Sequence, residues 1–175
     1  ITVAAVIRVF QEPELIFGNK DAVTENSDPA YNRDAMTLFG TGKVGNHLDE
    51  VRQTLTDNGF GDLFIVANDY REASQLSFYT PSHPQIFLLG YKDIYGRNYI
   101  FFRQEHEPRL LGKNALYVTQ YPSTLPKIRT FFAEVTRLEP FYIKDPSGNI
   151  MRIFYFYLCR NYAGDNTGIM DADRR

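Results

Sequence analysis

A short apolar run near the middle of the chain constrains the fold most. Residues 62–67 read Asp-Leu-Phe-Ile-Val-Ala, and turn-forming residues stand on both sides of them. A nearly continuous apolar run of this length is typical of a strand that is buried on both faces of a parallel sheet. The run therefore favours an α/β fold, in which helices cover the sheet.

Helix signals flank this strand. Before it, Asn46 can cap a helix that Gly59 can end. After it, Asp69 is suited to cap a second helix, with Glu72 three residues on in the manner of a capping box, and Pro81 stops that helix. The sequence thus predicts a helix, a buried strand and another helix in succession.

Two further core strands are predicted at residues 85–89 and 115–119. Between them, residues 90–113 are rich in Tyr, Phe and charged side chains and are predicted to form a long connection. Connections of this length inside a compact domain are uncommon and are often functional.

The last third of the chain is predicted to contain a helix at residues 123–135, with Pro126 in its first turn, and then a hairpin. The hairpin pairs residues 141–144 with 150–159, which are rich in β-branched and aromatic side chains, around the turn at 145–149. The expected fold is a Rossmann-like α/β domain: a mostly parallel sheet flanked by helices, with a C-terminal antiparallel hairpin at its edge.

The expected domain organisation has three parts. Residues 32–164 form a single α/β domain, preceded by an N-terminal segment and irregular connector at 1–31 and followed by a flexible tail at 165–175. No window reaches the roughly 18 to 20 apolar residues of a spanning helix, and the chain begins at Ile1 without an initiator Met. We therefore expect a soluble, excised domain. Residues 1–10 are expected to form either a buried first strand or helix, or the tail of a membrane helix that lies upstream.

Composition argues against several classes of function. The net charge of −2 gives no long-range attraction to nucleic acid, so no nucleic-acid partner is expected. The single Cys159 excludes an intrachain disulfide and a cysteine-rich metal site. The three His residues are scattered, so no metal site is predicted either.

A glycine motif supplies one alternative function. Gly40, Gly42 and Gly45 form a GxGxxG run after the strand-like residues 36–39, and Asp69 follows the next strand. In dinucleotide-binding folds such glycines let the backbone approach a pyrophosphate, and the acid binds a ribose hydroxyl about 20 residues on. A small NAD-type oxidoreductase-like domain is therefore one interpretation, and a plain strand-to-helix turn is the other.

A characteristic order of residues runs from 62 to 118. A strand is followed by a helix that starts at Tyr70, a Pro-x-x-Pro turn, a strand, an aromatic segment and a glycine-led strand; the matching positions are Tyr70, Ala73, Ser74, Phe78, Tyr79, Pro81, Pro84, Asn98, Tyr99, Phe102 and Gly112. This order resembles the C-terminal extracytoplasmic domain of bacterial membrane glycosyltransferases related to the dolichyl-phosphate-mannose protein mannosyltransferases and the aminoarabinose transferases.

The resemblance implies a role without catalytic residues in this chain. In that family the catalytic acid lies in a loop between membrane helices, and the sugar donor is a polyprenyl phosphate. The domain would cover the membrane part or position a lipid-linked sugar or glycan acceptor, on the extracytoplasmic side and without a cofactor. The expected contact surface includes Tyr79, Asn98, Tyr99 and Arg103, unless the tyrosines simply pack on the sheet. A free-standing α/β interaction module is the third interpretation.

Overall fold

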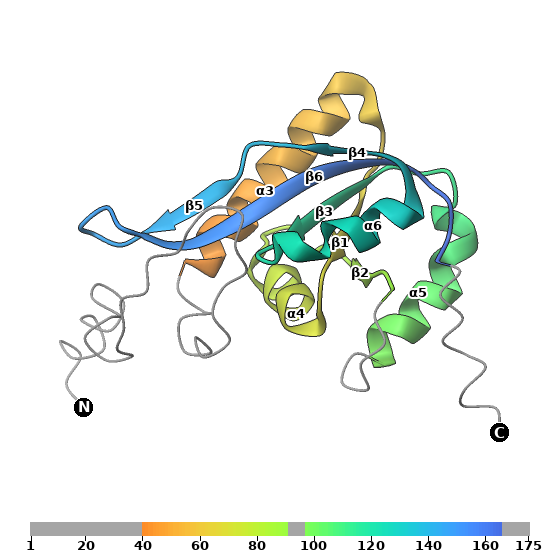
Figure 1. Cartoon of the computed structure of the whole chain (residues 1–175), viewed down its shortest axis with the longest axis horizontal. Coiled ribbons are helices and arrows are strands. Elements are labelled where there is room, and N and C mark those ends of the chain that lie inside the picture. Colours follow the sequence, from red (N-terminus) through yellow and green to blue (C-terminus); the bar gives the residue numbers. More distant parts are fainter. Residues whose placement is uncertain (1–39, 91–96, 166–175) are drawn as a thin grey trace.

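The computed structural model describes residues 40–90 and 97–165 of the chain (Figure 1). Its helices are α3 (Thr41–Leu55), α4 (Tyr70–Tyr79), α5 (Arg97–Leu110) and α6 (Leu125–Ile128), with a π-helical turn at Thr56–Phe60 and 3-10 turns at Pro122–Thr124 and Arg129–Phe131. Its strands are β1 (Phe64–Ala67), β2 (Ile86–Leu88), β3 (Ala115–Thr119), β4 (Phe132–Arg137), β5 (Phe141–Lys144) and β6 (Ile150–Tyr162).

The six strands form one mixed sheet in the order β2-β1-β3-β6-β4, with β5 also paired to β6. β1 pairs in parallel with β2 on one side and with β3 on the other. The long β6 runs antiparallel to β3, β4 and β5. The predicted α/β sheet with antiparallel strands toward one edge is confirmed.

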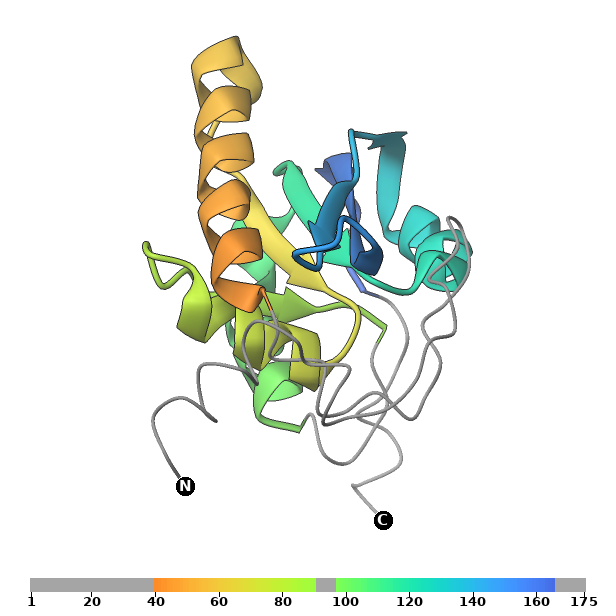
Figure 2. The ribbon, with the colours of Figure 1, turned by 90° about the vertical axis from the view of Figure 1, so that its left-hand side faces the viewer.

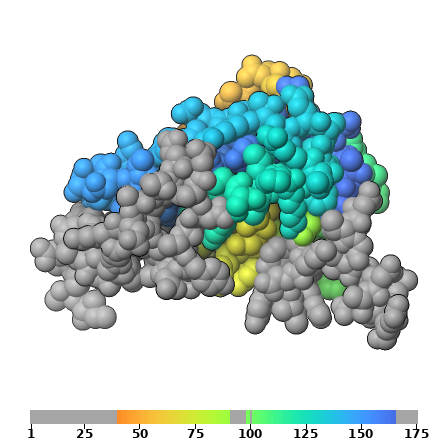
Figure 3. All heavy atoms as spheres, viewed as in Figure 1, coloured from red at the N-terminus to blue at the C-terminus, as the bar shows by residue number. Residues whose placement is uncertain are grey.

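Helices cover both faces of this sheet. α3 and α4 pack on one face, and α6 packs on the other, as the two orthogonal views show (Figures 1 and 2). In the space-filling view, side chains of α6 and β4 cover much of the near side (Figure 3). Adjacent strand residues point to opposite faces, so Ile65 and Ala67 join the core under α3 and α4, whereas Phe64 and Val66 join the core under α6.

Predictions from local sequence are confirmed for the central elements. All four residues of β1 are buried, as expected for a strand covered on both faces. Asp69 caps α4 by accepting hydrogen bonds from the backbone N–H groups of Arg71 and Glu72. Gly59 takes a left-handed conformation, with φ of 87°, in the turn that follows α3.

The predicted start of the first helix is wrong. α3 begins at Thr41 after the N-cap Gly40, so Asn46 lies inside the helix instead of capping it. Gly40 has φ of 71°, a left-handed conformation that glycine adopts without strain. Gly42 and Gly45 lower the helix propensity of this segment. Both are nevertheless helical, because α3 packs closely against the end of α4 at Gly45.

The segment predicted as a long connection contains α5. Residues 97–110 form this helix, and residues 91–96 lie outside the described part. The spacing of apolar residues does not predict this helix, because they do not form one stripe along it. It passes the edge strand β2, so Tyr99 near its start packs with the core under α3 and α4, whereas Leu110 at its end packs with the opposite core.

The predicted helix at 123–135 is also mostly wrong. Only Leu125–Ile128 is α-helical, and Phe132–Arg137 forms β4. Phe132 opposes Tyr162 and Val135 opposes Cys159 in the antiparallel ladder with β6. The spacing of apolar residues fits a helix, but pairing with a distant strand determines the conformation.

Several predictions fall on residues outside the described part. They concern the N-terminal segment and connector at 1–31, the strand-like residues 36–39, and the tail after Asp165. Asp165 itself is described and packs against α5. None of the helices in residues 40–90 and 97–165 has the length and apolarity to cross a membrane.

Candidate functional site

Polar side chains gather at the carboxyl ends of β1 and β3. The chain leaves β1 into α4 on one face of the sheet, and it leaves β3 toward α6 on the opposite face. At such a point the two connections, not the strands, diverge. Open α/β sheets bind their ligands in the crevice between diverging connections, outside the carboxyl ends of the strands. The groups at this point therefore form the candidate site.

Glu72 occupies the centre of the site. It lies in the first turn of α4, is only 4% exposed, and points inward. One carboxylate oxygen accepts a hydrogen bond from the backbone N–H of Gln120 at 2.6 Å, and the other accepts one from the backbone N–H of Asn68 at 3.3 Å. The Thr119 hydroxyl lies 3.5 Å from the first oxygen. Glu72 thus joins the ends of β1 and β3 instead of closing a capping box at Asp69.

The surroundings of Glu72 favour its neutral form. Burial and, to a smaller extent, the charge of Asp69 raise the pKa of Glu72 to about 8, although hydrogen bonds from Gln120, Asn68 and Thr119 act in the opposite direction. Removing a carboxylate from water disfavours its ionised form. The site therefore holds a carboxyl group that titrates within the neutral to weakly alkaline range.

Arg152 extends the cluster to β6 and α3. Its Nε donates a hydrogen bond to the Gln120 side-chain oxygen at 2.9 Å, and its Nη1 donates one to the Thr41 hydroxyl at 3.1 Å. The guanidinium lies 4.6 Å from the centroid of the Phe154 ring. Burial lowers the pKa of Arg152 to about 10, whereas the charge of Glu72 acts to raise it. The side chain remains a cation at neutral pH and ties the start of α3 to the sheet.

The glycines of the dinucleotide alternative lie at the start of α3. A Cβ added at Gly40 would lie 2.6 Å from a side-chain methyl group of Ile143, and a Cβ added at Gly45 would lie 2.4 Å from the Tyr79 carbonyl oxygen. A Cβ at Gly42 would meet nothing within 4 Å. Packing inside the protein therefore accounts for two of the three glycines. Asp69, the acid of that alternative, caps α4.

The residues expected at a sugar-contact surface separate into two groups. Tyr79 at the end of α4 and Asn98 in α5 are exposed. Tyr99 is half-buried, and its hydroxyl shares a hydrogen bond of 2.9 Å with the Ser74 hydroxyl, which links α5 to α4. Arg103 is buried, so the structure does not bring it to the surface with the others.

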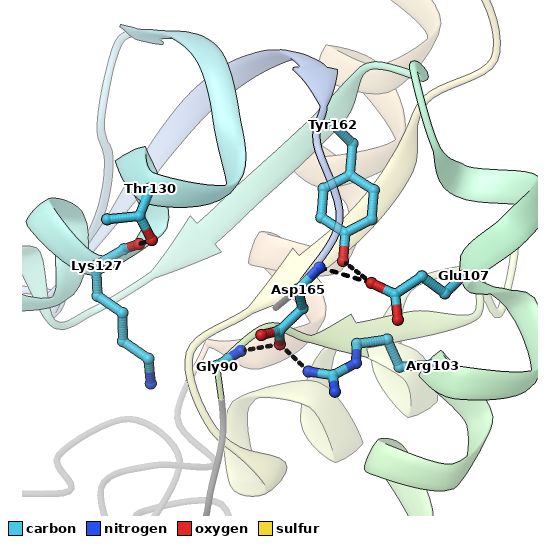
Figure 4. Close-up of polar contacts among 7 residues, drawn as sticks. All are labelled: Gly90, Arg103, Glu107, Lys127, Thr130, Tyr162 and Asp165. Carbon is cyan, nitrogen blue, oxygen red and sulfur yellow. Dashed lines mark hydrogen bonds and ion pairs between the residues drawn. The ribbon is translucent and has the colours of Figure 1, made fainter. Parts of the chain in front are cut away.

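Arg103 belongs to a polar cluster that anchors the last described residues to α5 (Figure 4). Its guanidinium forms an ion pair with the Asp165 carboxylate, which also accepts a hydrogen bond from the backbone N–H of Gly90. Glu107 accepts hydrogen bonds from the Tyr162 hydroxyl at 2.8 Å and from the backbone N–H of Asp165 at 2.6 Å. Burial lowers the pKa of Arg103, whereas Glu107 and Tyr162 act to raise it. These contacts give Arg103 a structural role.

Four exposed aromatic side chains lie on α4 and α5. The hydrogen bond between Ser74 and Tyr99 links these two helices. We call these four side chains the aromatic surface: Phe78 (71% exposed), Phe101 (57%), Phe102 (52%) and Tyr79 (38%). Large apolar groups exposed together often mark a contact site.

Sequence reasoning missed the charged cluster. In the sequence alone a capping box accounts for Glu72, so nothing there predicts that its side chain lies inside the protein. Arg152 carried the clearer signal, because it is the one charged residue in the apolar and aromatic run at 150–159. A charged residue in such a strand needs a buried partner or a hydrogen-bonding network.

Within the described ranges, no group of three His, Cys, Asp or Glu side chains could hold a metal ion.

No protein-family model, no curated protein and no solved structure matches this chain. Proposals for its function therefore rest on the order of its residues and on the geometry of the described part.

Proposed function

We propose that this chain is an accessory domain of an integral-membrane glycosyltransferase that uses a polyprenyl-phosphate-linked sugar. The domain covers the membrane part or positions the acceptor on the extracytoplasmic side, and the catalytic residues lie elsewhere in the same polypeptide. The observation that carries the proposal is the set of exposed aromatic side chains on α4 and α5, the aromatic surface defined above. It falls within the stretch whose residue order resembles that of the family.

The chemistry of the aromatic surface suits a sugar or a lipid-linked sugar. Planar rings present a broad apolar face, and they lose little conformational freedom when they become ordered against a ligand. Asn98 and the Ser74–Tyr99 pair supply hydrogen-bonding groups on the same two helices. Sugar recognition needs this combination, because a sugar ring has an apolar face and hydroxyl groups at its rim.

The buried carboxyl group of Glu72 does not suit glycosyl transfer. Both of its oxygens already accept hydrogen bonds from backbone N–H groups at the ends of β1 and β3. A general acid must reach the leaving oxygen of its substrate within hydrogen-bonding distance. We therefore assign Glu72 to the internal structure of the domain and leave the transfer reaction to the membrane part.

Binding to lipid-linked sugar tests the proposal. Nanodiscs that contain a polyprenyl-phosphate hexose, and matched nanodiscs that contain the polyprenyl phosphate without sugar, can be titrated into the isotope-labelled chain while its amide resonances are recorded. We expect resonances of α4 and α5 to shift only with the sugar-bearing lipid. The double variant Phe78→Ser and Phe101→Ser should abolish the shifts.

Leu111→Ser is the matched control, because Leu111 is also an exposed apolar residue, at 53%, but lies beyond the end of α5. It should bind like the unmodified chain. Equal shifts with both kinds of nanodisc, or binding that survives the double variant, would refute the proposed surface.

Two further measurements separate the alternatives. Titration with NAD(H), followed by nicotinamide fluorescence, should show no binding. Saturable binding that Gly42→Val removes would favour the dinucleotide interpretation.

The genomic reading frame that contains this chain should encode multiple membrane helices upstream of Ile1. A frame that starts near Ile1 would favour the free-standing interaction module.

A further inference from the structure

We propose that Arg103 and the backbone N–H of Gly90 form a carboxylate-binding site, which this chain fills with its own Asp165 as an internal ligand. A ligand that carries a carboxylate binds there when Asp165 swings away. This inference concerns the edge of the sheet beside β2 and does not depend on the proposed function.

The two donors converge on one carboxylate oxygen (Figure 4). The backbone N–H of Gly90 donates a hydrogen bond to Oδ2 of Asp165 at 2.5 Å, and Nη1 of Arg103 forms an ion pair with the same oxygen. Gly90 lies just beyond the end of β2, and Arg103 lies in the middle of α5. The carboxylate of Asp165 is therefore held outside the carboxyl end of a parallel strand, and ligands of open α/β sheets bind at this edge.

The backbone of Gly90 is shaped for this contact. Its φ of 60° is left-handed, a conformation that glycine adopts without strain. Backbone N–H groups in turns of this kind form anion-binding concavities. A Cβ added at Gly90 would overlap Cε of Lys127 and would lie 2.8 Å from Cζ of Phe131. The absence of a side chain thus lets Lys127 bring a second cationic group close to the site.

Arg103 has donor capacity that Asp165 does not use. The side chain is only 2% exposed, and within the described ranges its Nε is buried without a hydrogen-bond partner. A buried N–H group without an acceptor is destabilising. A guanidinium binds a carboxylate most strongly through two parallel hydrogen bonds, but Asp165 contacts only Nη1. A carboxylate that is not tethered to the chain is free to take the bidentate geometry.

Asp165 reaches the site over a glycine hinge. Tyr162 is fixed by backbone hydrogen bonds with Gly112 and Lys113. Between Tyr162 and Asp165, Gly164 has φ of 96°, a conformation that other residues rarely adopt. Rotation at Gly164 moves the carboxylate out of the site and leaves Tyr162 in place. Because the tether is short, the internal carboxylate has a high effective concentration, so a natural ligand must bring contacts beyond its carboxylate.

Vacating the site tests its ligand class. Asp165→Ala removes the internal carboxylate from the full chain, and formate or acetate is then titrated while the Gly90 amide and Arg103 Nε–H resonances are recorded. We expect saturable shifts with half-saturation at millimolar concentrations, and a higher melting temperature with either carboxylate. Sodium chloride at the same ionic strength should produce neither effect. The unmodified chain should not respond to the same concentrations, because Asp165 occupies its site.

The double variant Asp165→Ala and Arg103→Gln is the matched control. It keeps the vacated site but removes the guanidinium, so its affinity for formate should fall by about tenfold or more. Glu134→Ala removes an exposed carboxylate on β4 and should respond like the unmodified chain. Equal responses to formate and chloride, shifts that do not saturate, or formate binding that survives Arg103→Gln would overturn the site.

Hydrogen exchange in the unmodified chain tests whether Asp165 leaves the site, and this measurement needs no variant to fold. We expect exchange of the Gly90 amide to be insensitive to low concentrations of urea, because it occurs through a local opening at Gly164. Exchange of the amides of β1 should accelerate with urea, because they open only when the domain unfolds. The same urea dependence at Gly90 as in β1 would show that Asp165 never leaves the folded domain and would overturn the proposal.

Discussion

Alanine at position 45 should destabilise this protein, although alanine forms helices better than glycine. Gly45 lies in the second turn of α3, where its backbone is helical. An added Cβ would lie 2.4 Å from the carbonyl oxygen of Tyr79, 2.7 Å from the carbonyl carbon of Tyr79 and 2.8 Å from the Cα of Thr80. All three are backbone atoms, so no change of rotamer makes room for the methyl group. α3 must instead move away from the end of α4.

Two opposing effects set the magnitude. Glycine to alanine inside a helix stabilises by about 1 kcal/mol. Overpacking a close contact costs about 1 to 3 kcal/mol, and contact with backbone atoms places this case at the upper end. We therefore expect a net loss of about 2 kcal/mol in the free energy of unfolding. For a protein of this size the loss corresponds to a fall of about 4 to 8 °C in the melting temperature.

Gly42→Ala is the matched control. Gly42 lies in the same helix, and a Cβ added there would meet nothing within 4 Å. Its variant should therefore be as stable as the unmodified chain or more stable, by up to about 1 kcal/mol. Urea unfolding followed by circular dichroism measures both variants. Equal stability of Gly45→Ala and Gly42→Ala would refute the argument that close packing of α3 on α4 requires glycine.

Other substitutions test separate contacts by the same unfolding assay. Asp165→Asn should lower the free energy of unfolding by about 3 kcal/mol, because it removes the carboxylate that forms an ion pair with the buried Arg103. Glu134→Ala breaks an exposed ion pair and should lower the free energy of unfolding by less than about 1 kcal/mol. Asp69→Ala should cost about 1 kcal/mol through loss of the helix cap, and Asp69→Ser should restore most of it. Tyr117→Phe should cost about 1 kcal/mol by removing a hydrogen bond of 2.5 Å from a buried hydroxyl group. Equal losses for Asp165→Asn and Glu134→Ala, or none for Asp69→Ala or Tyr117→Phe, would contradict these assignments.

Local sequence predicted the central elements well, because their signals are local. The apolar run at β1 and the cap at Asp69 each act within a few residues, so the strand and the start of α4 follow from them. β4 and α5 did not follow. β4 exists because it pairs with β6, although its apolar spacing fits a helix. α5 packs against both cores as it passes β2, so its apolar residues form no single stripe.

The candidate site was less predictable than the fold. The four exposed aromatic side chains fall in the segment that sequence order singled out, but their exposure depends on how α4 meets α5. Arg103 looked like a surface residue because its neighbours in sequence are polar and aromatic. Its ion pair with Asp165 joins residues 62 positions apart, and nothing near Arg103 in the sequence indicates that partner.

The central strand β1 and the cap of α4 were thus determined by the local sequence, because the apolar run of β1 and the hydrogen bonds of the Asp69 cap involve near neighbours along the chain. The tertiary structure alone decided that Glu72 faces inward and meets the backbone of Gln120, 48 positions away. Burial raises the pKa of a carboxyl group, and burial exists only after distant segments have packed together.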